Sequence, residues 1–254
     1  MPQTKLLILG GSSEGAILAR ALASDPRFEA TISLAGRTEH PAESPIPVRS
    51  GGFGGVEGLA RYLTENRIGV LVDATHPFAA EMKGNAVNAA RLTGTNFLAI
   101  RRLAWTPQPG DNWIMVEGVE EAAAALGDTP KRVLLTTGRK ELAPFNAAAQ
   151  HFYLLRSVET PAPDALPPRV KVISARGPFT FADEFKLLKA HAIEVLVTKN
   201  SGGTATAPKL AAARALNLPI IMVRRPEIPD APSVETVAEA LAWLERGHGA
   251  TSSA

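Results

Sequence analysis

The chain has 254 residues, of which 45% are hydrophobic and 20% are charged, a composition typical of a globular protein with one large or two modest domains. Cysteine is absent, which excludes disulfides and thiolate chemistry and fits a cytoplasmic protein; the first apolar strand begins too early for a signal peptide, and no apolar run approaches the ~20 residues that span a bilayer. The net charge of +2 without a Lys/Arg block predicts no nucleic-acid partner, and the scattered histidines predict no metal site.

The first predicted element is an apolar strand followed by a glycine-rich turn. Leu6–Leu9 is a short apolar run, and after Gly10–Gly15 apolar residues resume at helical spacing. Strand, glycine turn and helix in this order form the first half of a nucleotide-binding βαβ unit, in which the helix N-terminus presents N–H groups to a phosphate. The fingerprint G-x-G-x-x-G has serine in its middle position here. We expect a cofactor site at Gly10, Gly11, Ser12, Ser13, Glu14 and Gly15; the competing interpretation is an ordinary strand–helix turn with a serine cap.

Strands then alternate with helices as far as residue 100. Further strands are predicted at Phe28–Leu34, near Val48, at Gly69–Asp73 and at Asn96–Ile100. Helices are predicted at Val56–Asn66 and Phe78–Leu92. This alternation predicts a parallel doubly wound sheet with the strand order 3-2-1-4-5.

Two loops at the ends of these strands are candidates for cofactor binding, because ligands of open α/β sheets lie beyond the carboxyl ends of the strands. The second strand is followed by Gly36, Arg37 and Thr38 rather than by an acidic residue. An arginine there can pair with a 2′-phosphate, which favours NADP over NAD, whereas the alternative is a solvated surface arginine. After the fourth strand, Thr75 and His76 can offer hydrogen bonds to the ribose and nicotinamide, and Pro77 can start the next helix.

A proline-rich stretch, Arg101–Asp111, interrupts the pattern and predicts a crossing between two domains, residues 1–104 and 105–254. The second half again alternates strands with helices. We therefore predict an α/β protein made of two Rossmann-like parallel-sheet domains with a cleft between them. The predicted strands are Trp113–Val116, Lys131–Leu135, Phe152–Val158, Val170–Ser174, Ile193–Thr198 and Pro219–Val223. The predicted helices are Glu120–Leu126, Glu141–Gln150, Phe181–His191, Ala207–Leu216 and Val234–Arg246.

Three loops of the second half each carry a cation beside a glycine directly after a buried-looking strand. Loops that converge at one sheet edge would form a basic wall that holds carboxylates or phosphates by charge-assisted hydrogen bonds. Taken singly, each cation is an ordinary surface residue. The expected substrate-binding residues are Gly138, Arg139, Lys140, Arg176, Gly177, Lys199, Asn200, Ser201 and Gly202.

The same stretches resemble the precorrin-6A reductase family of cobalamin (vitamin B12) biosynthesis. The matching segments span nearly the whole chain: Ile8–Gly15, Asp73–Ala79, Thr136–Lys140, Arg176–Phe179, Thr198–Gly202 and Pro219–Pro226. The resemblance implies that the protein reduces precorrin-6A to precorrin-6B with NADPH, adding a hydride at C19 of the tetrapyrrole and a proton at C18. The substrate carries acetate and propionate groups, which suits the basic loops.

The proton donor stays open among Lys199, His76, Tyr153, a substrate carboxylic acid and water, and Lys199 is the candidate catalytic residue. Two other functions are compatible with the sequence: an NADPH-dependent reductase of another polyanion, and a non-catalytic NADPH-binding sensor. The sequence does not determine the oligomeric state, and a monomer is compatible with it.

Overall fold

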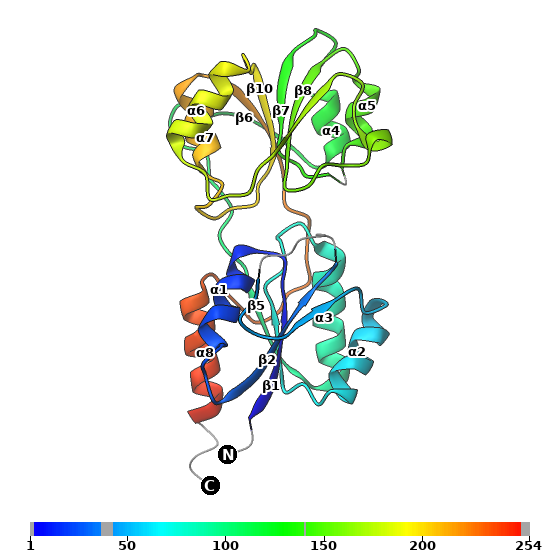
Figure 1. The fold of residues 1–254 in the computed structure, drawn as a ribbon, viewed down its shortest axis with the longest axis vertical. Coiled ribbons are helices and arrows are strands. Elements are labelled where there is room, and N and C mark those ends of the chain that lie inside the picture. The colour runs from blue at the N-terminus through cyan, green and yellow to red at the C-terminus, as the bar shows by residue number, and fades with distance from the viewer. Residues whose placement is uncertain (1–2, 37–42, 140, 250–254) are drawn as a thin grey trace. The chain divides into compact units, whose positions relative to one another are not determined.

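A computed structural model describes residues 3–36, 43–139 and 141–249. The chain forms two compact units (Figure 1). Unit 1 contains the described residues of Met1–Leu103 and Pro226–Ala254, and unit 2 is Ala104–Arg225. Each unit contains one six-stranded parallel sheet with helices on its faces, so the predicted α/β class with two Rossmann-like sheets is confirmed. Among the described residues, no helix has the length and hydropathy needed to cross a membrane.

The sheet of unit 1 has the order β3-β2-β1-β4-β5-β12. The predicted order 3-2-1-4-5 is therefore confirmed, with one additional strand beside β5. The strands are β1 (Thr4–Leu9), β2 (Phe28–Leu34), β3 (Val48–Ser50), β4 (Val70–Asp73), β5 (Asn96–Ile100) and β12 (Ser233–Val234).

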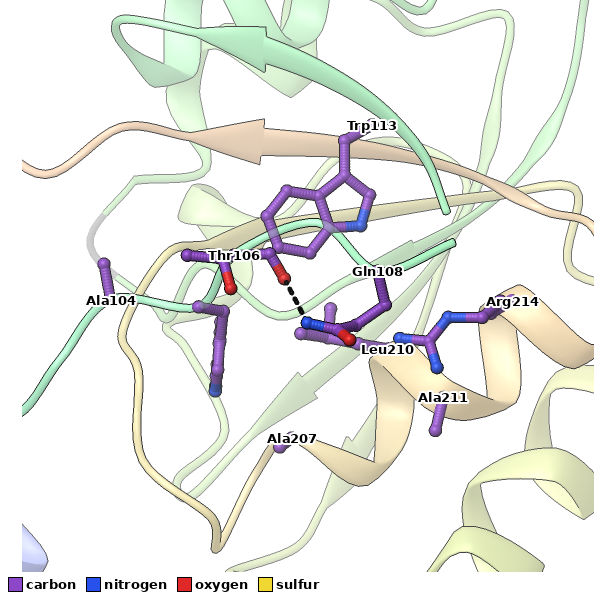
Figure 2. A pocket seen from close by; sticks show the side chains of 9 residues that line it. Ala104, Thr106, Gln108, Trp113, Ala207, Leu210, Ala211 and Arg214 are labelled. Carbon is purple, nitrogen blue, oxygen red and sulfur yellow. Dashed lines mark hydrogen bonds between the residues drawn. The ribbon is translucent and has the colours of Figure 1, made fainter. Parts of the chain in front are cut away.

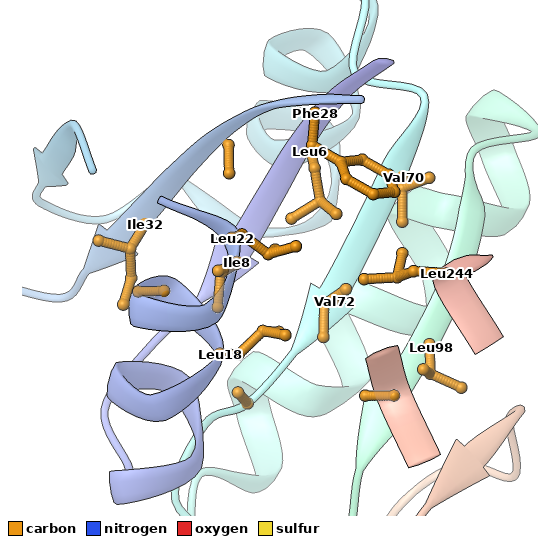
Figure 3. Close-up of a cluster of buried hydrophobic side chains, with 14 of the residues drawn as sticks. Leu6, Ile8, Leu18, Leu22, Phe28, Ile32, Val70, Val72, Leu98 and Leu244 are labelled. Atoms are coloured by element: carbon orange, nitrogen blue, oxygen red, sulfur yellow. The ribbon is translucent and has the colours of Figure 1, made fainter. Parts of the chain in front are cut away.

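The central strand β1 is buried on both faces because alternate side chains point to opposite sides of a sheet. Leu6 and Ile8 pack in one core cluster, drawn in Figure 3, and Leu7 and Leu9 pack in another. The first cluster also takes residues of α1 (Ser13–Leu22) and α8 (Val237–Gly249), and the second takes residues of α2 (Gly55–Glu65) and α3 (Ala80–Thr93). The apolar run Leu6–Leu9 therefore lies in the middle of the sheet, which is covered by α1 and α8 on one face and by α2 and α3 on the other.

The C-terminal segment belongs to unit 1, so the predicted boundary that assigned residues 105–254 to one domain is wrong. β12 pairs in parallel with β5, and Ala240 and Leu244 of α8 are buried in the core cluster of unit 1. Arg101 strengthens this return, since its guanidinium donates to the carbonyl of Pro229 at 2.7 Å. The amphipathic pattern of the last helix predicts a buried face, but not which sheet that face covers.

The sheet of unit 2 has the order β6-β11-β10-β7-β8-β9. Its strands are β6 (Asn112–Val116), β7 (Arg132–Leu135), β8 (Phe152–Ser157), β9 (Val170–Ser174), β10 (Val195–Lys199) and β11 (Pro219–Val223). Its helices are α4 (Val119–Ala124), α5 (Ala143–Ala147), the 3₁₀ turn η1 (Pro163–Ala165), α6 (Phe181–Ala190) and α7 (Pro208–Ala215). The helix predicted at Glu141–Gln150 is reduced to the short α5.

Both sheets reverse their direction of winding at one place. In unit 1 the chain runs from β1 outward to β3 and then returns to add β4 on the other side of β1. In unit 2 it runs from β7 outward to β9 and then returns to add β10 on the other side of β7. These are topological switch points, at whose carboxyl ends the loops diverge and leave room for ligands. The loops after β1 and β4 in unit 1, and those after β7 and β10 in unit 2, are therefore the candidate ligand-binding loops.

A glycine in the interior of α2 is required by its surroundings. A Cβ atom on Gly58 would lie 1.7 Å from the carbonyl oxygen of Phe53, whereas a Cβ atom on Gly84 of α3 would meet nothing within 4 Å. We expect Gly58→Ala to lower the free energy of unfolding, and Gly84→Ala to raise it by about 0.5–1 kcal/mol through helix propensity. Urea denaturation of both variants checks this; equal stabilisation by the two substitutions would contradict the steric argument.

Candidate functional site

The glycine turn after β1 is closely packed at two of its positions. A Cβ atom on Gly10 would lie 2.8 Å from side-chain atoms of both Ile32 and Leu34, and one on Gly15 would lie 3.3 Å from the Cα of Gly10. Gly11, with φ +124°, has open space around it. Glycine at positions 10 and 15 therefore lets the start of α1 approach β1 and β2, which keeps the helix N-terminus close to the end of β1.

Ser12 is the N-cap of α1. Its Oγ accepts a hydrogen bond from the amide of Gly15 at 3.3 Å and donates its proton to the carbonyl of Ala74 at 2.7 Å. The hydroxyl group is therefore used within the fold, joining the turn to the end of β4. Within the part of the chain that the structure describes, the amide groups of Gly11, Ser12 and Ser13 donate to no protein acceptor, so they are available to an anion at the positive end of the helix dipole.

Glu14 and Arg102 form an ion pair beside this turn, and Arg102 is not among the residues that the sequence motifs predict. The guanidinium NH1 of Arg102 lies 2.8 Å from Glu14 Oε2, with both side chains largely shielded from solvent. Burial raises the pKa of Glu14, but hydrogen bonds and the charge of Arg102 outweigh it, so the net pKa lies below its usual value. Arg102 is the second residue after β5, and that position near a strand end is the signal that could have identified it.

The lowered pKa of Glu14 predicts a pH-dependent contribution to stability. A carboxyl group whose pKa is lower in the folded state stabilises the fold above its unfolded pKa of about 4.3, and this stabilisation is lost as the pH falls through the folded pKa. We expect Glu14→Gln to be less stable than the parent protein at pH 7 and to approach it at pH 3. Urea midpoints measured between pH 7 and pH 3 check this, and a difference independent of pH would contradict it.

The loop after β4 is ordered by a buried ion pair. Lys83 and Asp73 are 3% and 1% exposed, and Lys83 Nζ lies 3.0 Å from Asp73 Oδ2. Asp73 Oδ1 accepts hydrogen bonds from the amide of Thr75 at 3.0 Å and from its hydroxyl at 2.6 Å. The hydroxyl proton of Thr75 is thus engaged, and its oxygen keeps only acceptor capacity toward a ligand.

His76 and Pro77 lie in the next turn of this loop. The Nδ1 atom of His76 accepts a hydrogen bond from the amide of Phe78 at 3.3 Å. In the neutral imidazole the proton is then on Nε2, which makes Nε2–H the donor of this side chain. The helix begins at Ala80 rather than at Pro77, because the amide of Ala79 closes a turn onto the carbonyl of His76 at 2.9 Å.

At the end of β2, Gly36 adopts a left-handed conformation with φ +65°. Arg37 and Thr38, the residues expected to bind the 2′-phosphate, lie outside the described residues. Arg49 of β3 is nearby: it donates to the carbonyls of Gly51 and Gly52 at 2.6 and 2.7 Å and stacks 3.8 Å above the ring of Phe53. Arg49 is therefore a structural cation, which holds the loop after β3.

In unit 2, two of the predicted substrate-binding cations are paired with glutamates. Arg139 NH1 lies 2.8 Å from Glu159 Oε2, and Lys199 Nζ lies 2.5 Å from Glu141 Oε2. The first pair joins the loops after β7 and β8, and the second joins the end of β10 to the loop after β7. Lys140, which lies between them in sequence, is outside the described residues.

The loop after β10 is fixed by residues outside it. Asn200 is buried, and its side-chain amide exchanges two hydrogen bonds with the backbone of Trp105, at 2.8 and 2.9 Å. Arg225 donates to the carbonyls of Asn200 and Ser201 at 2.9 and 3.0 Å. The side chain of Asn200 is therefore committed to the fold, and its backbone is engaged as well, since its amide donates to the carbonyl of Val223 at 2.9 Å. Gly202 supplies the left-handed turn, with φ +67°.

The loop after β9 reaches the same edge of the sheet. The amide of Phe179 donates to the carbonyl of Ala205 at 3.1 Å, and a Cβ atom on Gly177 would lie 3.3 Å from that oxygen. Under the ring of Phe179, at 4.0 Å, lies the guanidinium of Arg156, which forms a buried ion pair with Glu184 of α6. This buried pair supports the loop that carries Arg176, which is itself exposed.

Tyr153 is excluded as a proton donor. Its side chain is completely buried near the amino end of β8, and its hydroxyl donates to the carbonyl of Ala148 at 2.8 Å. Burial raises its pKa to about 12. A phenol so placed has neither access to a ligand nor a proton to release near neutral pH.

A hollow of about 330 Å³ lies elsewhere in unit 2, beside α7, and Figure 2 shows the side chains that line it. Its cation is Arg214, which is bound by Asp111 at 2.8 Å, so its charge is already balanced. Trp113 at the start of β6 forms part of the wall. This hollow is lined mainly by apolar side chains and is distinct from the loops that carry Arg139 and Lys199.

The comparison with known proteins decides the family. The profile described as "Precorrin-6x reductase CbiJ/CobK" matches residues 5–245. The chain belongs to the precorrin-6x reductase family. As a member of that family it is an oxidoreductase, in agreement with the resemblance of its motifs.

Relatives of the precorrin-6x reductase family match almost end to end. The precorrin-6A reductase of Sinorhizobium sp is 49% identical, over 95% of this chain and 92% of that protein. The enzyme of the same name from Rhodobacter capsulatus is 46% identical, over 98% of both chains. A solved structure of CobK precorrin-6A reductase superimposes with a TM-score of 0.91 at 46% identity and covers 96% of this chain and 97% of its own. The last match confirms the α/β fold with two Rossmann-like domains.

Proposed function

We propose that this reductase converts the cobalt-free macrocycle precorrin-6A to precorrin-6B, with NADPH as the hydride source. The observation that supports this most strongly is the near-complete alignment with proteins named precorrin-6A reductase, at 43–49% identity. Relatives named cobalt-precorrin-6A reductase are less similar, for example 31% identical in Priestia megaterium. This difference favours the ring without cobalt.

Unit 1 is the proposed site of the cofactor. The amides of Gly11, Ser12 and Ser13 would hold the pyrophosphate at the N-terminus of α1. The loops after β2 and β4 would bind the rest of the cofactor. The proposed cofactor-binding residues are Gly10, Gly11, Ser12, Ser13, Glu14, Gly15, Gly36, Arg37, Thr38, Thr75, His76 and Pro77.

Unit 2 is the proposed site of the tetrapyrrole carboxylates. The cations come from loops after different strands, and these loops are joined at one sheet edge by the contacts of Lys199 with Glu141 and of Phe179 with Ala205. Such a set binds several carboxylates of one ligand by charge-assisted hydrogen bonds. The proposed substrate-binding residues are Gly138, Arg139, Lys140, Arg176, Gly177, Lys199, Asn200, Ser201 and Gly202.

When bound, the nicotinamide supplies the hydride that reduces the ring. The protein contributes position and one proton, which goes to the carbon next to the one that receives the hydride. We assign this proton to Nζ of Lys199, which is 12% exposed and is held by Glu141 at the end of β10. Glu141 would hold the ammonium of Lys199 in place before the substrate binds.

Turnover of purified precorrin-6A tests the proposed function. We expect oxidation of NADPH in one-to-one proportion to the loss of substrate, and slower oxidation with cobalt-precorrin-6A. A protein that binds NADPH but does not oxidise it with either ring would contradict the proposal and favour the sensor hypothesis.

Arg37 provides a test of cofactor choice. If its guanidinium pairs with the 2′-phosphate, Arg37→Glu should weaken NADPH binding by a factor of ten or more and leave NADH binding little changed, because NADH lacks that phosphate. Titration of both cofactors by fluorescence measures this. Arg20→Glu, on an exposed position of α1, is the matched control. Equal losses for both cofactors would show that Arg37 does not bind the 2′-phosphate.

A further inference from the structure

The two described ion pairs at the substrate-binding edge of unit 2 have a common design. Arg139 and Lys199 come from the loop after β7 and the end of β10, and each is bound by a carboxylate of the protein, from Glu159 and Glu141 respectively. The partners are far apart in sequence, so the pairs arise from the order of the strands. A ligand carboxylate that binds either cation therefore competes with a glutamate for its charge and its N–H groups.

We propose that Glu141 and Glu159 determine the specificity of this site by holding its cations until a polycarboxylate replaces both glutamates together. The inference rests on the proposed function, since it takes Arg139 and Lys199 as the groups that bind the tetrapyrrole carboxylates. Binding is then an exchange of ion pairs rather than the formation of new ones.

The exposures of the four side chains suit an exchange. Lys199 is 12% exposed, and a cation so shielded requires an anionic partner at all times because an unpaired buried charge is costly. Glu141 and Glu159 are 36% and 21% exposed, so each can turn its carboxylate toward water once it is displaced. The pair of Arg156 and Glu184 is 7% and 1% exposed and has no such route to solvent.

The exchange discriminates between ligands by their number of carboxylates. A small anion that displaces one glutamate only exchanges one ion pair for another. It also competes with the glutamate carboxylate, which is tethered beside the cation at high effective concentration. A rigid ring with several carboxylates is held at the site once its first carboxylate has bound. Its second carboxylate then has a high effective concentration too, and competes with the second glutamate without a disadvantage. The glutamates therefore exclude phosphate and small carboxylic acids while admitting the macrocycle.

This predicts a gain of affinity on removing a negative charge. Glu159→Gln and Glu141→Gln keep the size of the side chain and remove the competitor, so each should lower the KM for precorrin-6A about two- to fivefold. Citrate, a small polycarboxylate, should inhibit the double variant at concentrations several-fold lower than those that inhibit the parent protein. The double variant should also show a steeper increase of KM with salt, because its binding forms new ion pairs rather than exchanging old ones.

The experiment measures KM for precorrin-6A at two salt concentrations, and the inhibition constant of citrate, for five variants. These are Glu141→Gln, Glu159→Gln, their combination, Arg139→Ala and the control Glu194→Gln, whose carboxylate accepts a hydrogen bond from the amide of Arg132 at the amino end of β7. A lower KM in the first three, with a higher KM in Arg139→Ala and none of these changes in the control, supports the inference.

A higher or unchanged KM in the glutamine variants, together with a higher KM in Arg139→Ala, would overturn the inference, because the glutamates would then only orient their cations. The proposed function would survive that result. An unchanged KM in Arg139→Ala would instead remove the carboxylate site from unit 2. Circular dichroism melts verify that each variant is folded.

Discussion

Lys83→Met should destabilise unit 1 by about 3–5 kcal/mol. The substitution leaves the carboxylate of Asp73 buried without its cation, and breaking a buried ion pair on one side carries this cost. We also expect NADPH binding to weaken, because Asp73 positions the loop that carries Thr75 and His76. Urea denaturation measures the stability, and fluorescence titration measures the affinity for NADPH.

Two matched variants separate this pair from an ordinary surface pair. Lys5→Met breaks the contact of Lys5 with Glu29, whose side chains are 43% and 60% exposed and 3.8 Å apart, and it should cost less than about 0.5 kcal/mol. Adding Asp73→Asn to Lys83→Met removes the buried charge and keeps an acceptor for Thr75, so it should restore part of the loss. A Lys83→Met variant as stable as Lys5→Met would disprove the role of the buried pair.

Lys199→Ala should reduce both substrate affinity and turnover, whereas Arg139→Ala should reduce affinity alone. Losing one partly buried carboxylate contact of about 1.4 kcal/mol raises KM roughly tenfold. Lys199 also holds the proposed proton, and removing a general acid lowers kcat by about a hundredfold or more. Binding of NADPH should change little in either variant, since its proposed site is in unit 1.

Steady-state kinetics of both variants checks these expectations. Lys189→Ala, at an exposed position in the last turn of α6, is the control for loss of a lysine in the same unit. A solvent isotope effect on kcat in the parent protein that disappears in Lys199→Ala would identify the proton transfer. If kcat of Lys199→Ala equals that of Arg139→Ala, another group donates the proton.

The sequence predicts much of the fold, because local signals specify it. The buried runs of β1 and β4 and the glycine turn between Gly10 and Gly15 predict the order of the first sheet, including its switch point. The sequence does not predict where β12 and α8 pack, since an amphipathic helix shows that one face is buried without showing which sheet covers it. The prediction that residues 226–254 belong to the second domain is therefore wrong.

For the candidate site, the sequence identifies residue types and strand ends but not which groups are already engaged. Ser12 and Asn200 match their predicted positions, yet their side chains bind backbone atoms. Tyr153 was a candidate acid because a tyrosine can donate a proton, and only its burial excludes it. The two glutamates leave no local pattern, because they form ion pairs with residues distant in sequence. Arg102 has the signal of its place near the end of β5, but its partner Glu14 is also distant in sequence.

The return of the chain to unit 1 after unit 2 has a consequence for synthesis on the ribosome. Because β12 and α8 are made last, the first hundred residues leave the exit tunnel while the edge of β5 is unpaired and one face of their sheet lacks its second helix. Unit 2 has no such delay, since all its strands are contiguous in the chain. The half of the protein that is translated first is therefore the half that finishes folding last, and its exposed strand edge is where a growing chain is most prone to aggregate.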